Sequence, residues 1–230
     1  MPIASILPRT LVDAYGAIQV TLDGGSTCTV SVRNYKCRNP SFGGTVKAEA
    51  FKDELLFASK MKVLSDLPAQ RLVDVFTGKG RIGDIALALR LVVRYGVVGT
   101  TGDVEGELQK VCDEHIGLDC NGFVGNWASS NGITTFGAQT APLDIGRAYP
   151  DKRKTLKDMQ ALDVIVWSNH VAVLEDTSVG TDESEVCDVA ESFGSIMYRP
   201  LIISRTPTPG QFTVLGHGGT AVIFSIGLTS

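Results

Sequence analysis

Six short apolar segments, four to eight residues long, follow one another through the last third of the chain. Gly, Pro, Asp and Ser separate them, which is typical of strands joined by turns rather than by helices. Turns between consecutive segments can join antiparallel neighbours, whereas parallel neighbours need a longer crossover. The segments therefore predict an antiparallel sheet. The strands are expected at 163–167, 170–175, 185–191, 196–203, 212–215 and 221–226.

The residues before this sheet predict a hairpin followed by helices. Residues 17–38 alternate apolar and polar side chains around Asp23-Gly24-Gly25, which predicts a β-hairpin. Apolar residues then recur at helical spacing. Helices are expected over 46–61, 67–76, 82–98, 104–115 and 119–130, with a surface loop over 132–155. Helices followed by an antiparallel sheet predict an α+β fold, with 1–100 as an N-terminal hairpin and helical extension and 101–230 as the main domain.

Charge and hydropathy exclude several classes of partner. The formal net charge is −4, which gives no basic surface for nucleic acid. The longest apolar stretch, 82–98, contains three charged residues and is too short to cross a bilayer, so no membrane partner is expected. The N-terminus lacks a basic region followed by an apolar one, which predicts synthesis in the cytoplasm without a Sec signal. Five cysteines without such a signal predict free thiols rather than a disulfide framework.

One of these thiols lies where a helix is expected to begin. Asp119 is a suitable N-cap and would place Cys120 in the first helical turn. Unpaired N–H groups and the helix dipole stabilise a thiolate there, and the thiolate is the nucleophilic form of cysteine. Phe123 and Trp127, four residues apart, are expected to fix the helix on the core. The pattern predicts a reactive Cys120.

A histidine follows about fifty residues later. Residues 162–174 predict two apolar strands around a short polar turn, and His170 begins the second strand. A histidine at the start of a packed strand can be held rigidly toward a thiol on a helix. His170 is therefore the candidate general base.

These two segments resemble the NlpC/P60 family of cell-wall amidohydrolases and endopeptidases, and more loosely the related CHAP amidases. The family has a D-C-S-G-F-like segment at its nucleophile helix, and 119–123 read D-C-N-G-F. It also has a G-D-hydrophobic strand before an H-V-(A/G)-hydrophobic strand. Here 162–165 read L-D-V-I and 170–173 read H-V-A-V. The departures are Asn121 for serine and Leu162 for glycine, and the likeness covers about residues 104–200.

The resemblance implies a papain-like core with 101–230 as the catalytic domain. It implies a cysteine peptidase or amidase that needs no metal or other cofactor, acting on amide bonds of peptidoglycan or muropeptides. A polar residue on the strand after the histidine would orient the imidazole. Glu191 is the preferred candidate because it shares a strand face with Cys187 and Val189, and Asp188 and Ser192 are the alternatives.

In family members the residues that flank the cysteine often recognise the substrate. Asp119 and Asn121 are therefore candidate substrate-binding residues, although Asp119 also suits a purely structural N-cap. Without a Sec signal, delivery to the cell wall would need another route.

Several alternatives remain open. Cys112, His115 and Cys120 with Cys187 could hold zinc, although the paired C-x2–4-C ligands of most structural zinc sites are absent. His217 is a second candidate base. The 78–80 turn, G-K-G, lacks the ending of a phosphate-binding loop. The rival functions are a non-catalytic structural or binding protein, such as a phage virion or tail component, and a thiol amidase or acyltransferase with a non-wall substrate.

Overall fold

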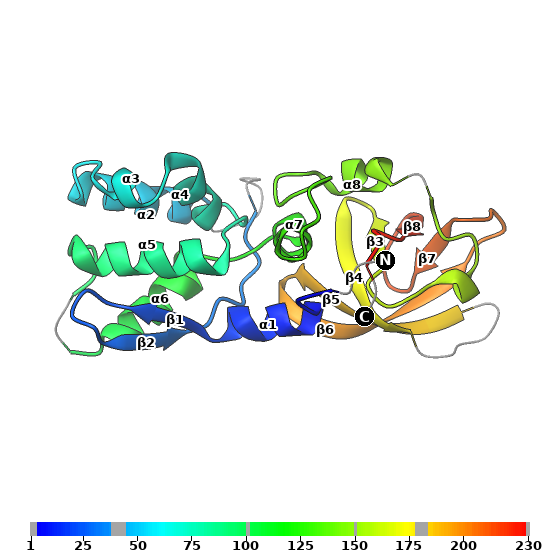
Figure 1. Ribbon diagram of the computed structural model, residues 1–230, viewed down its shortest axis with the longest axis horizontal. Helices are drawn as coiled ribbons and strands as arrows, with labels where there is room; N and C mark the ends of the chain where they lie inside the picture. The colour runs from blue at the N-terminus through cyan, green and yellow to red at the C-terminus, as the bar shows by residue number, and fades with distance from the viewer. Residues whose placement is uncertain (1–3, 38–44, 100–101, 150, 178–183, 229–230) are drawn as a thin grey trace. The chain divides into compact units, whose positions relative to one another are not determined.

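Apart from one hairpin, helices make up the chain as far as Ala148, and the strands of a separate sheet follow from Val164, so the α+β prediction is confirmed (Figure 1). The computed structural model describes all residues except 1–3, 38–44, 100–101, 150, 178–183 and 229–230. The helices are α1 (Pro8–Gly16), α2 (Thr45–Ala58), α3 (Val63–Asp66), α4 (Ala69–Phe76), α5 (Ile82–Arg94), α6 (Val104–His115), α7 (Cys120–Ser130) and α8 (Pro142–Ala148), with a 3-10 turn, η1, at Leu156–Asp158. The strands are β1 (Ile18–Thr21), β2 (Thr27–Val30), β3 (Val164–Trp167), β4 (His170–Thr177), β5 (Ser184–Phe193), β6 (Ser195–Arg205), β7 (Phe212–Val214) and β8 (Ala221–Phe224).

The chain forms two compact units whose boundary differs from the predicted one. The barrel unit comprises Met1–Val12, Cys120–Ser192 and Met197–Ser230, and the helical unit comprises Asp13–Asp119 and Phe193–Ile196. The predicted boundary between residues 100 and 101 would assign α6 to the catalytic domain. Instead α6 packs on α2 and β2, so it belongs to the helical unit. The division falls immediately before Cys120.

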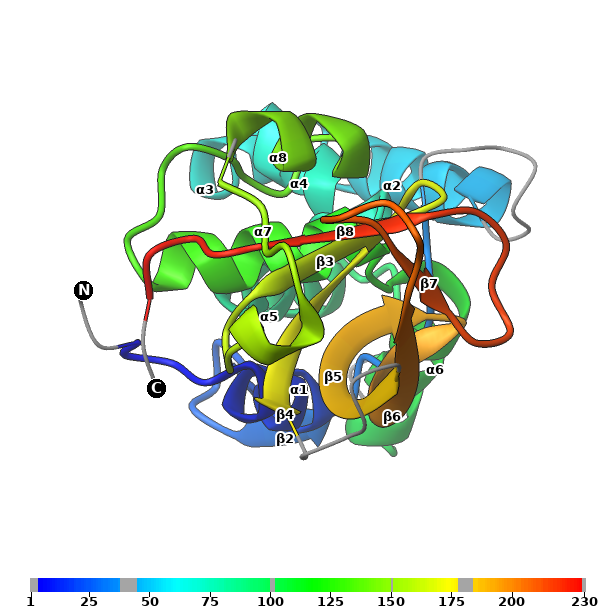
Figure 2. The same ribbon diagram turned by 90° about the vertical axis from the view of Figure 1, so that its right-hand side faces the viewer.

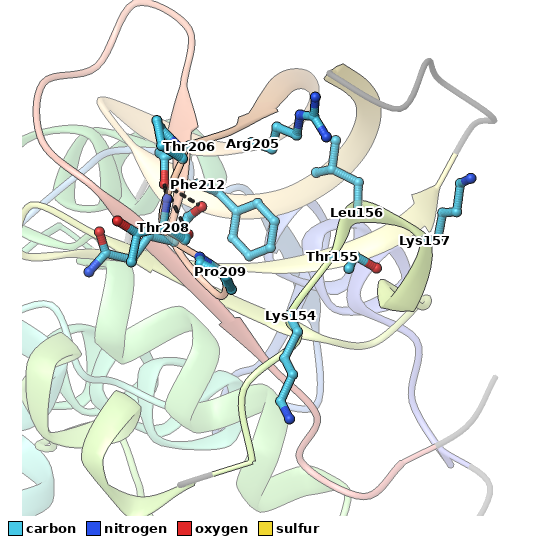
Figure 3. A pocket seen from close by; sticks show the side chains of 11 residues that line it. Lys154, Thr155, Leu156, Lys157, Arg205, Thr206, Thr208, Pro209 and Phe212 are labelled. Carbon is cyan, nitrogen blue, oxygen red and sulfur yellow. Dashed lines mark hydrogen bonds between the residues drawn. The ribbon is translucent and has the colours of Figure 1, made fainter.

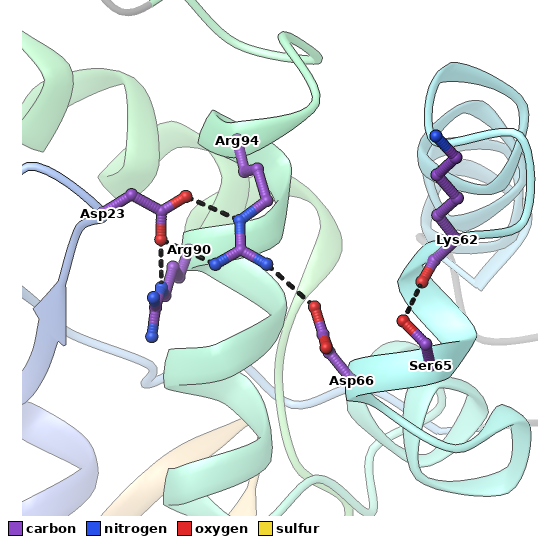
Figure 4. A network of polar contacts seen from close by, with 6 residues as sticks. All are labelled: Asp23, Lys62, Ser65, Asp66, Arg90 and Arg94. Carbon is purple, nitrogen blue, oxygen red and sulfur yellow. Dashed lines mark hydrogen bonds and ion pairs between the residues drawn. The ribbon is translucent and has the colours of Figure 1, made fainter.

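In the helical unit, the predicted hairpin is confirmed as β1 and β2, paired antiparallel from Ile18↔Val30 to Thr21↔Thr27. Its turn is tied to the helix that packs on β1. Arg90 and Arg94 of α5 both donate to the Asp23 carboxylate, and Arg94 also reaches Asp66 (Figure 4). These hydrogen bonds from Arg94 and Arg90 hold the pKa of Asp23 well below its usual range.

Helix α5 is shorter than predicted. The sequence indicates a helix to residue 98, but α5 ends at Arg94 because Gly96 takes a left-handed conformation with φ +69°. The Gly96 N–H donates to Val93 O and the Val97 N–H to Val92 O, the paired bonds of a Schellman motif. Within the described residues, no helix is both long enough and apolar enough to span a membrane.

The barrel unit is built on a closed antiparallel barrel in the order β3-β4-β5-β6-β7-β8 (Figure 2). All six predicted strands are confirmed, and their ends differ from prediction by at most two residues. Closure was not predicted, because the sequence indicates only an antiparallel sheet. It depends on β3 pairing with β8, from Val164↔Phe224 to Trp167↔Ala221.

Side chains alternate between the interior and the exterior of this barrel. The interior core contains Ile165, Trp167, Ala172, Leu174, Cys187, Val189, Leu201, Ile203, Phe212, Val214, Ala221 and Ile223. On β4, β5 and β6, the residue two positions from the interior core on the same strand face is polar. His170 precedes Ala172, Glu191 follows Val189, and Arg199 precedes Leu201. These three polar residues therefore extend the apolar core at one end of the barrel.

Helix α7 packs on the outside of this barrel, against β4. Val171 and Val173 alternate with the interior residues of β4, yet both are fully buried because a helix covers them. Phe123 and Trp127 of α7 are fully buried, as predicted, and the Trp127 indole N–H donates to Ile6 O at 2.9 Å. The Cys120 helix is thus anchored on the strand that begins with His170.

The predicted surface loop over 132–155 contains a helix. Pro142 begins α8, consistent with the preference for proline in a first helical turn. The helix has seven residues, and Ile145 is its only large apolar side chain that is fully buried. So short a helix with one buried apolar residue has no readable period, which explains why the sequence predicts a loop.

Candidate active site

The end of the barrel interior holds a buried His–Glu pair. His170 Nε2 lies 2.6 Å from Glu191 Oε2. His170 is 7% exposed and Glu191 is fully buried. An ionised carboxylate can only accept, so a neutral His170 carries its proton on Nε2, and Nδ1 keeps the lone pair of a base. Glu191 therefore lies where the sequence analysis expects the residue that orients the imidazole.

A third charged group completes this cluster. Arg199 Nε donates to Oε1 of Glu191, so the two carboxylate oxygens contact two different side chains, the His170 imidazole and the Arg199 guanidinium. Burial by itself raises the pKa of Glu191. The hydrogen bonds and charges of His170 and Arg199 outweigh it, and the net pKa lies below the ordinary value. Glu191 therefore remains a charged acceptor at neutral pH.

Two rings lie beside this cluster. The Trp167 ring contacts the His170 ring edge to face, with centroids 4.6 Å apart, and the His217 ring from 5.5 Å. Burial, and next the charge of Arg199, lower the pKa of His217. His217, the alternative base, lies within 3.5 Å of the Arg199 guanidinium. A histidine beside a permanent cation is a poorer proton acceptor than one beside a carboxylate.

The Cys120 thiol contacts the turn that leads into His170. Cys120 is the first residue of α7, as predicted, and its Sγ lies 3.9 Å from Asn169 O. The two turn residues, Ser168 and Asn169, have φ of +42° and +67°, the left-handed values that a tight hairpin turn requires. Such values cost on the order of 1 kcal/mol per non-glycine residue. The turn brings the residue before His170 into contact with the sulfur.

The segment that leads into α7 is held on the helical unit. The Leu118 N–H donates to Asn34 O and the Asp119 N–H to Gly78 O. The Asp119 carboxylate pairs with Lys79 Nζ at 2.5 Å, and both side chains are buried. The 78–80 turn thus binds a carboxylate of its own chain. Asp119, a predicted substrate-binding residue, has a structural partner.

The other predicted substrate-binding residue also has a structural contact. The Asn121 side-chain amide donates to Thr140 O at 2.8 Å. This bond ties the first turn of α7 to the segment that precedes α8. The structure therefore explains an amide at position 121, where the resembling family usually has serine, without invoking substrate.

Helix α7 approaches the following loop at a glycine. A Cβ added at Gly125 would lie 2.2 Å from Ala138 N and 2.3 Å from Gly137 C, both backbone atoms. We expect Gly125→Ala to push α7 from this loop and to destabilise the protein by about 1–3 kcal/mol, the usual cost of overpacking. Urea denaturation would measure the loss. Gly137→Ala is the control, because its Cβ meets nothing within 4 Å. Equal stability of the two variants would contradict the predicted close contact.

The alternative third residues occupy other environments. Asp188 accepts a 3.0 Å hydrogen bond from the Tyr198 hydroxyl and lies on the opposite strand face from Glu191. Ser192 is fully buried, also on the opposite face. Glu191 is the one of the three that contacts His170 directly.

The zinc alternative gains no support from the arrangement of side chains. Across the described ranges, no three His, Cys, Asp or Glu side chains gather closely enough to hold a metal ion. His115 stacks on Phe51 with ring centroids 4.3 Å apart. Burial raises the pKa of the Cys112 and Cys187 thiols to about 12, which disfavours the thiolate that zinc requires.

Two of the hollows in the described part of the barrel unit are lined by barrel strands. One of about 550 Å³ lies between α8 and strands β3 and β8, and Trp167 and Ser168 line it. It therefore adjoins the turn that contacts Cys120. The other, about 440 Å³, is lined by Lys154, Lys157 and Arg205 above an apolar base (Figure 3). Arg205 is six residues along β6 from Arg199, about 20 Å at strand rise.

Comparison with known proteins does not extend these observations. No family model, curated protein or solved structure matches the chain.

Arg199 and Trp167 were missed in the sequence analysis. A signal for both exists, since each shares the interior face of its strand with buried apolar residues. A charged residue at such a position is conspicuous once the interior face is known.

Proposed function

We propose that the barrel unit is a cysteine amidohydrolase or endopeptidase in which Cys120 is the nucleophile, His170 the base and Glu191 the orienting acid. The observation that carries this proposal is the buried 2.6 Å contact between His170 Nε2 and Glu191 Oε2. It lies at the start of the strand whose preceding residue contacts the Cys120 sulfur. A nucleophile, a base and a third group that orients the base are the elements of a hydrolytic triad.

The proposed reaction is acyl transfer to water. His170 Nδ1 takes the thiol proton, and the Cys120 thiolate attacks the amide carbonyl carbon. The positive end of the α7 dipole, at whose first residue Cys120 lies, favours the oxyanion that forms. Collapse breaks the C–N bond, and His170 protonates the departing amine. Water, deprotonated by His170, then attacks the thioester and releases the acid and the thiol.

The proposed substrate is an amide bond of peptidoglycan stem peptides or muropeptides. It rests on the resemblance of residues 119–123 and 162–173 to the NlpC/P60 family. A Cys-bearing helix packed on an antiparallel sheet that begins a strand with His supports a papain-like core, with barrel closure as a departure. Synthesis in the cytoplasm would make delivery by a phage particle or a contractile secretion machine, or recycling of cytoplasmic muropeptides, the accompanying expectation.

The first test compares the Cys120 thiol with those of Cys28, Cys112 and Cys187. At pH 7 a thiol with a pKa of about 12, as in Cys112 and Cys187, is ionised in about one molecule in 10⁵. Burial raises the pKa of Cys28 as well. We expect iodoacetamide to alkylate Cys120 at least about 100-fold faster than these three, as resolved by peptide mass spectrometry. Alkylation of Cys120 no faster than the others would exclude the proposed nucleophile.

The second test identifies the substrate. Purified sacculi and soluble muropeptides are incubated with the wild type and with Cys120→Ala, and the fragments are separated by chromatography. New amine and carboxyl ends should appear only with the wild type. A reactive Cys120 with identical fragment profiles would overturn the peptidoglycan assignment and favour the non-wall amidase or acyltransferase. An unreactive Cys120 with identical profiles would favour the structural or binding protein.

A further inference from the structure

The carboxylate behind the proposed base is shared between an imidazole and a guanidinium. Glu191 Oε2 contacts His170 on β4, and Oε1 accepts from Arg199 Nε on β6. The carboxylate is completely buried, while the Arg199 side chain is 28% exposed. Removing one partner of a buried charge leaves the other partner inadequately compensated, so these three groups depend on one another.

Glu191 is held at both oxygens, Oε2 by His170 and Oε1 by Arg199. This two-point arrangement, called the fork below, fixes the direction of the carboxylate. A carboxylate held by a single hydrogen bond can turn about its χ angles, whereas one held through both oxygens cannot turn without breaking a bond. Arg199 therefore holds Oε1 on the β6 side and leaves Oε2 directed at His170 Nε2. That direction keeps the proton of neutral His170 on Nε2 and the basic lone pair on Nδ1.

The charge of Arg199 has a second consequence. The titratable and charged groups that act on Glu191 are His170 from β4 and Arg199 from β6, and His217 from the turn after β7 also interacts with it. A permanent cation beside a buried carboxylate offsets the cost of keeping that carboxylate ionised. The same cation disfavours a second positive charge on His217, whose ring lies within 3.5 Å.

We propose that Arg199 is a positioning residue of this site, which holds Oε1 of Glu191 and so directs Oε2 of the carboxylate toward His170. The proposal deepens the proposed function and rests on it for its catalytic meaning. Arg199 contacts Glu191 rather than the thiol or the imidazole, so it acts on the reaction only through Glu191.

The test uses NMR of the full chain, which contains only three histidines. Nitrogen-15 shifts of the imidazoles report the tautomer of His170 and the protonation of His217. The carboxyl carbon shift of Glu191 reports its ionisation and is assigned with Glu191→Gln. The variants are Arg199→Met, which removes the charge and the fork, and Arg199→Lys, which keeps the charge. Arg205→Met, at the last residue of β6 and six residues beyond Arg199, is the matched control.

We expect the wild type to hold neutral His170 as the Nε2–H tautomer. Arg199→Met should give a mixture of tautomers, raise the midpoint of Glu191 ionisation by about one pH unit and raise that of His217. Arg199→Lys should restore the midpoint of Glu191 ionisation because it keeps the positive charge. It should restore only part of the His170 tautomer preference, because an ammonium lacks the planar set of N–H donors of a guanidinium. Arg205→Met should change none of these.

A folded Arg199→Met whose His170 tautomer and Glu191 midpoint equal those of the wild type would overturn the proposal. If Arg199→Met does not fold, Arg199→Lys decides it, since an unchanged tautomer ratio in that variant would contradict the role of the fork. None of these readouts needs a substrate. An unreactive Cys120 together with the expected NMR changes would therefore reject the hydrolase and leave the role of Arg199 standing.

Discussion

Cys120→Ala should lower amide hydrolysis by about 10⁴-fold or more, because no other group in the proposed site can form the thioester. Cys120→Ser should be almost as inactive, since a hydroxyl is far less ionised than a thiol at neutral pH. The measurement is the initial rate of release of new amine ends from muropeptides. Both variants should unfold near the wild-type urea midpoint, because serine and alanine are close to cysteine in size. They therefore fit the same site, which is 4% exposed.

Cys28→Ala is the control for the loss of a thiol. Cys28 is also buried, and burial raises the pKa of its thiol. It lies on β2 in the helical unit and takes no part in the proposed reaction. This variant should keep the full rate. Residual hydrolysis within about tenfold of the wild type in Cys120→Ala would show that a different group performs the chemistry.

Glu191→Gln should lower kcat by about 10²–10⁴-fold with little change in KM. The physical reason is a conflict between donors. His170 Nε2–H and Arg199 Nε–H both need an acceptor, and the carboxylate supplies one oxygen to each. A glutamine offers one oxygen and one NH2 group, so one of these N–H groups must face another donor. The preferred imidazole tautomer is lost, or a buried guanidinium bond is lost.

The same substitution should also destabilise the protein by about 1–3 kcal/mol, the usual penalty for a buried polar group left without its partner. Asp188→Asn on the same strand is the matched control, because Asp188 faces away from His170 and bonds to Tyr198. We expect its kcat to remain within about threefold of the wild type. Loss of activity in Asp188→Asn with an active Glu191→Gln would reverse the assignment of the third residue.

The helices and strands of this chain were largely predictable because their signals are local. Short apolar segments separated by turn residues identified the six strands, and the helix predicted over 104–115 has the observed bounds of α6. Barrel closure was not predictable in this way, since the pairing of Val164 with Phe224 joins residues 60 positions apart. The unit boundary was missed for the same reason, because the packing of α6 on β2 leaves no trace in either segment.

The residues of the candidate site likewise differ in whether a local signal predicts them. Cys120 and His170 carry local signals, a helix start and a strand start, and strand alternation was enough to prefer Glu191 over Asp188. Arg199 carries only a weaker signal, its place two residues before Leu201 on one face of β6, and an arginine in a strand usually faces solvent. Its role depends on which face of β6 closes over the barrel interior. The structural contacts of Asp119 and Asn121 likewise depend on Lys79 and Thr140, which are remote in sequence.

Barrel closure limits how a peptide can be recognised. Many proteins bind an extended peptide by adding it as one more strand at an open sheet edge. In the barrel each of β3–β8 is paired on both sides, so these described strands leave no sheet edge for a guest strand. A substrate must then be held by side chains, helix ends and turns. Selectivity would accordingly depend on the shape and chemistry of individual substrate groups more than on an extended backbone, which suits short, branched or non-standard peptides.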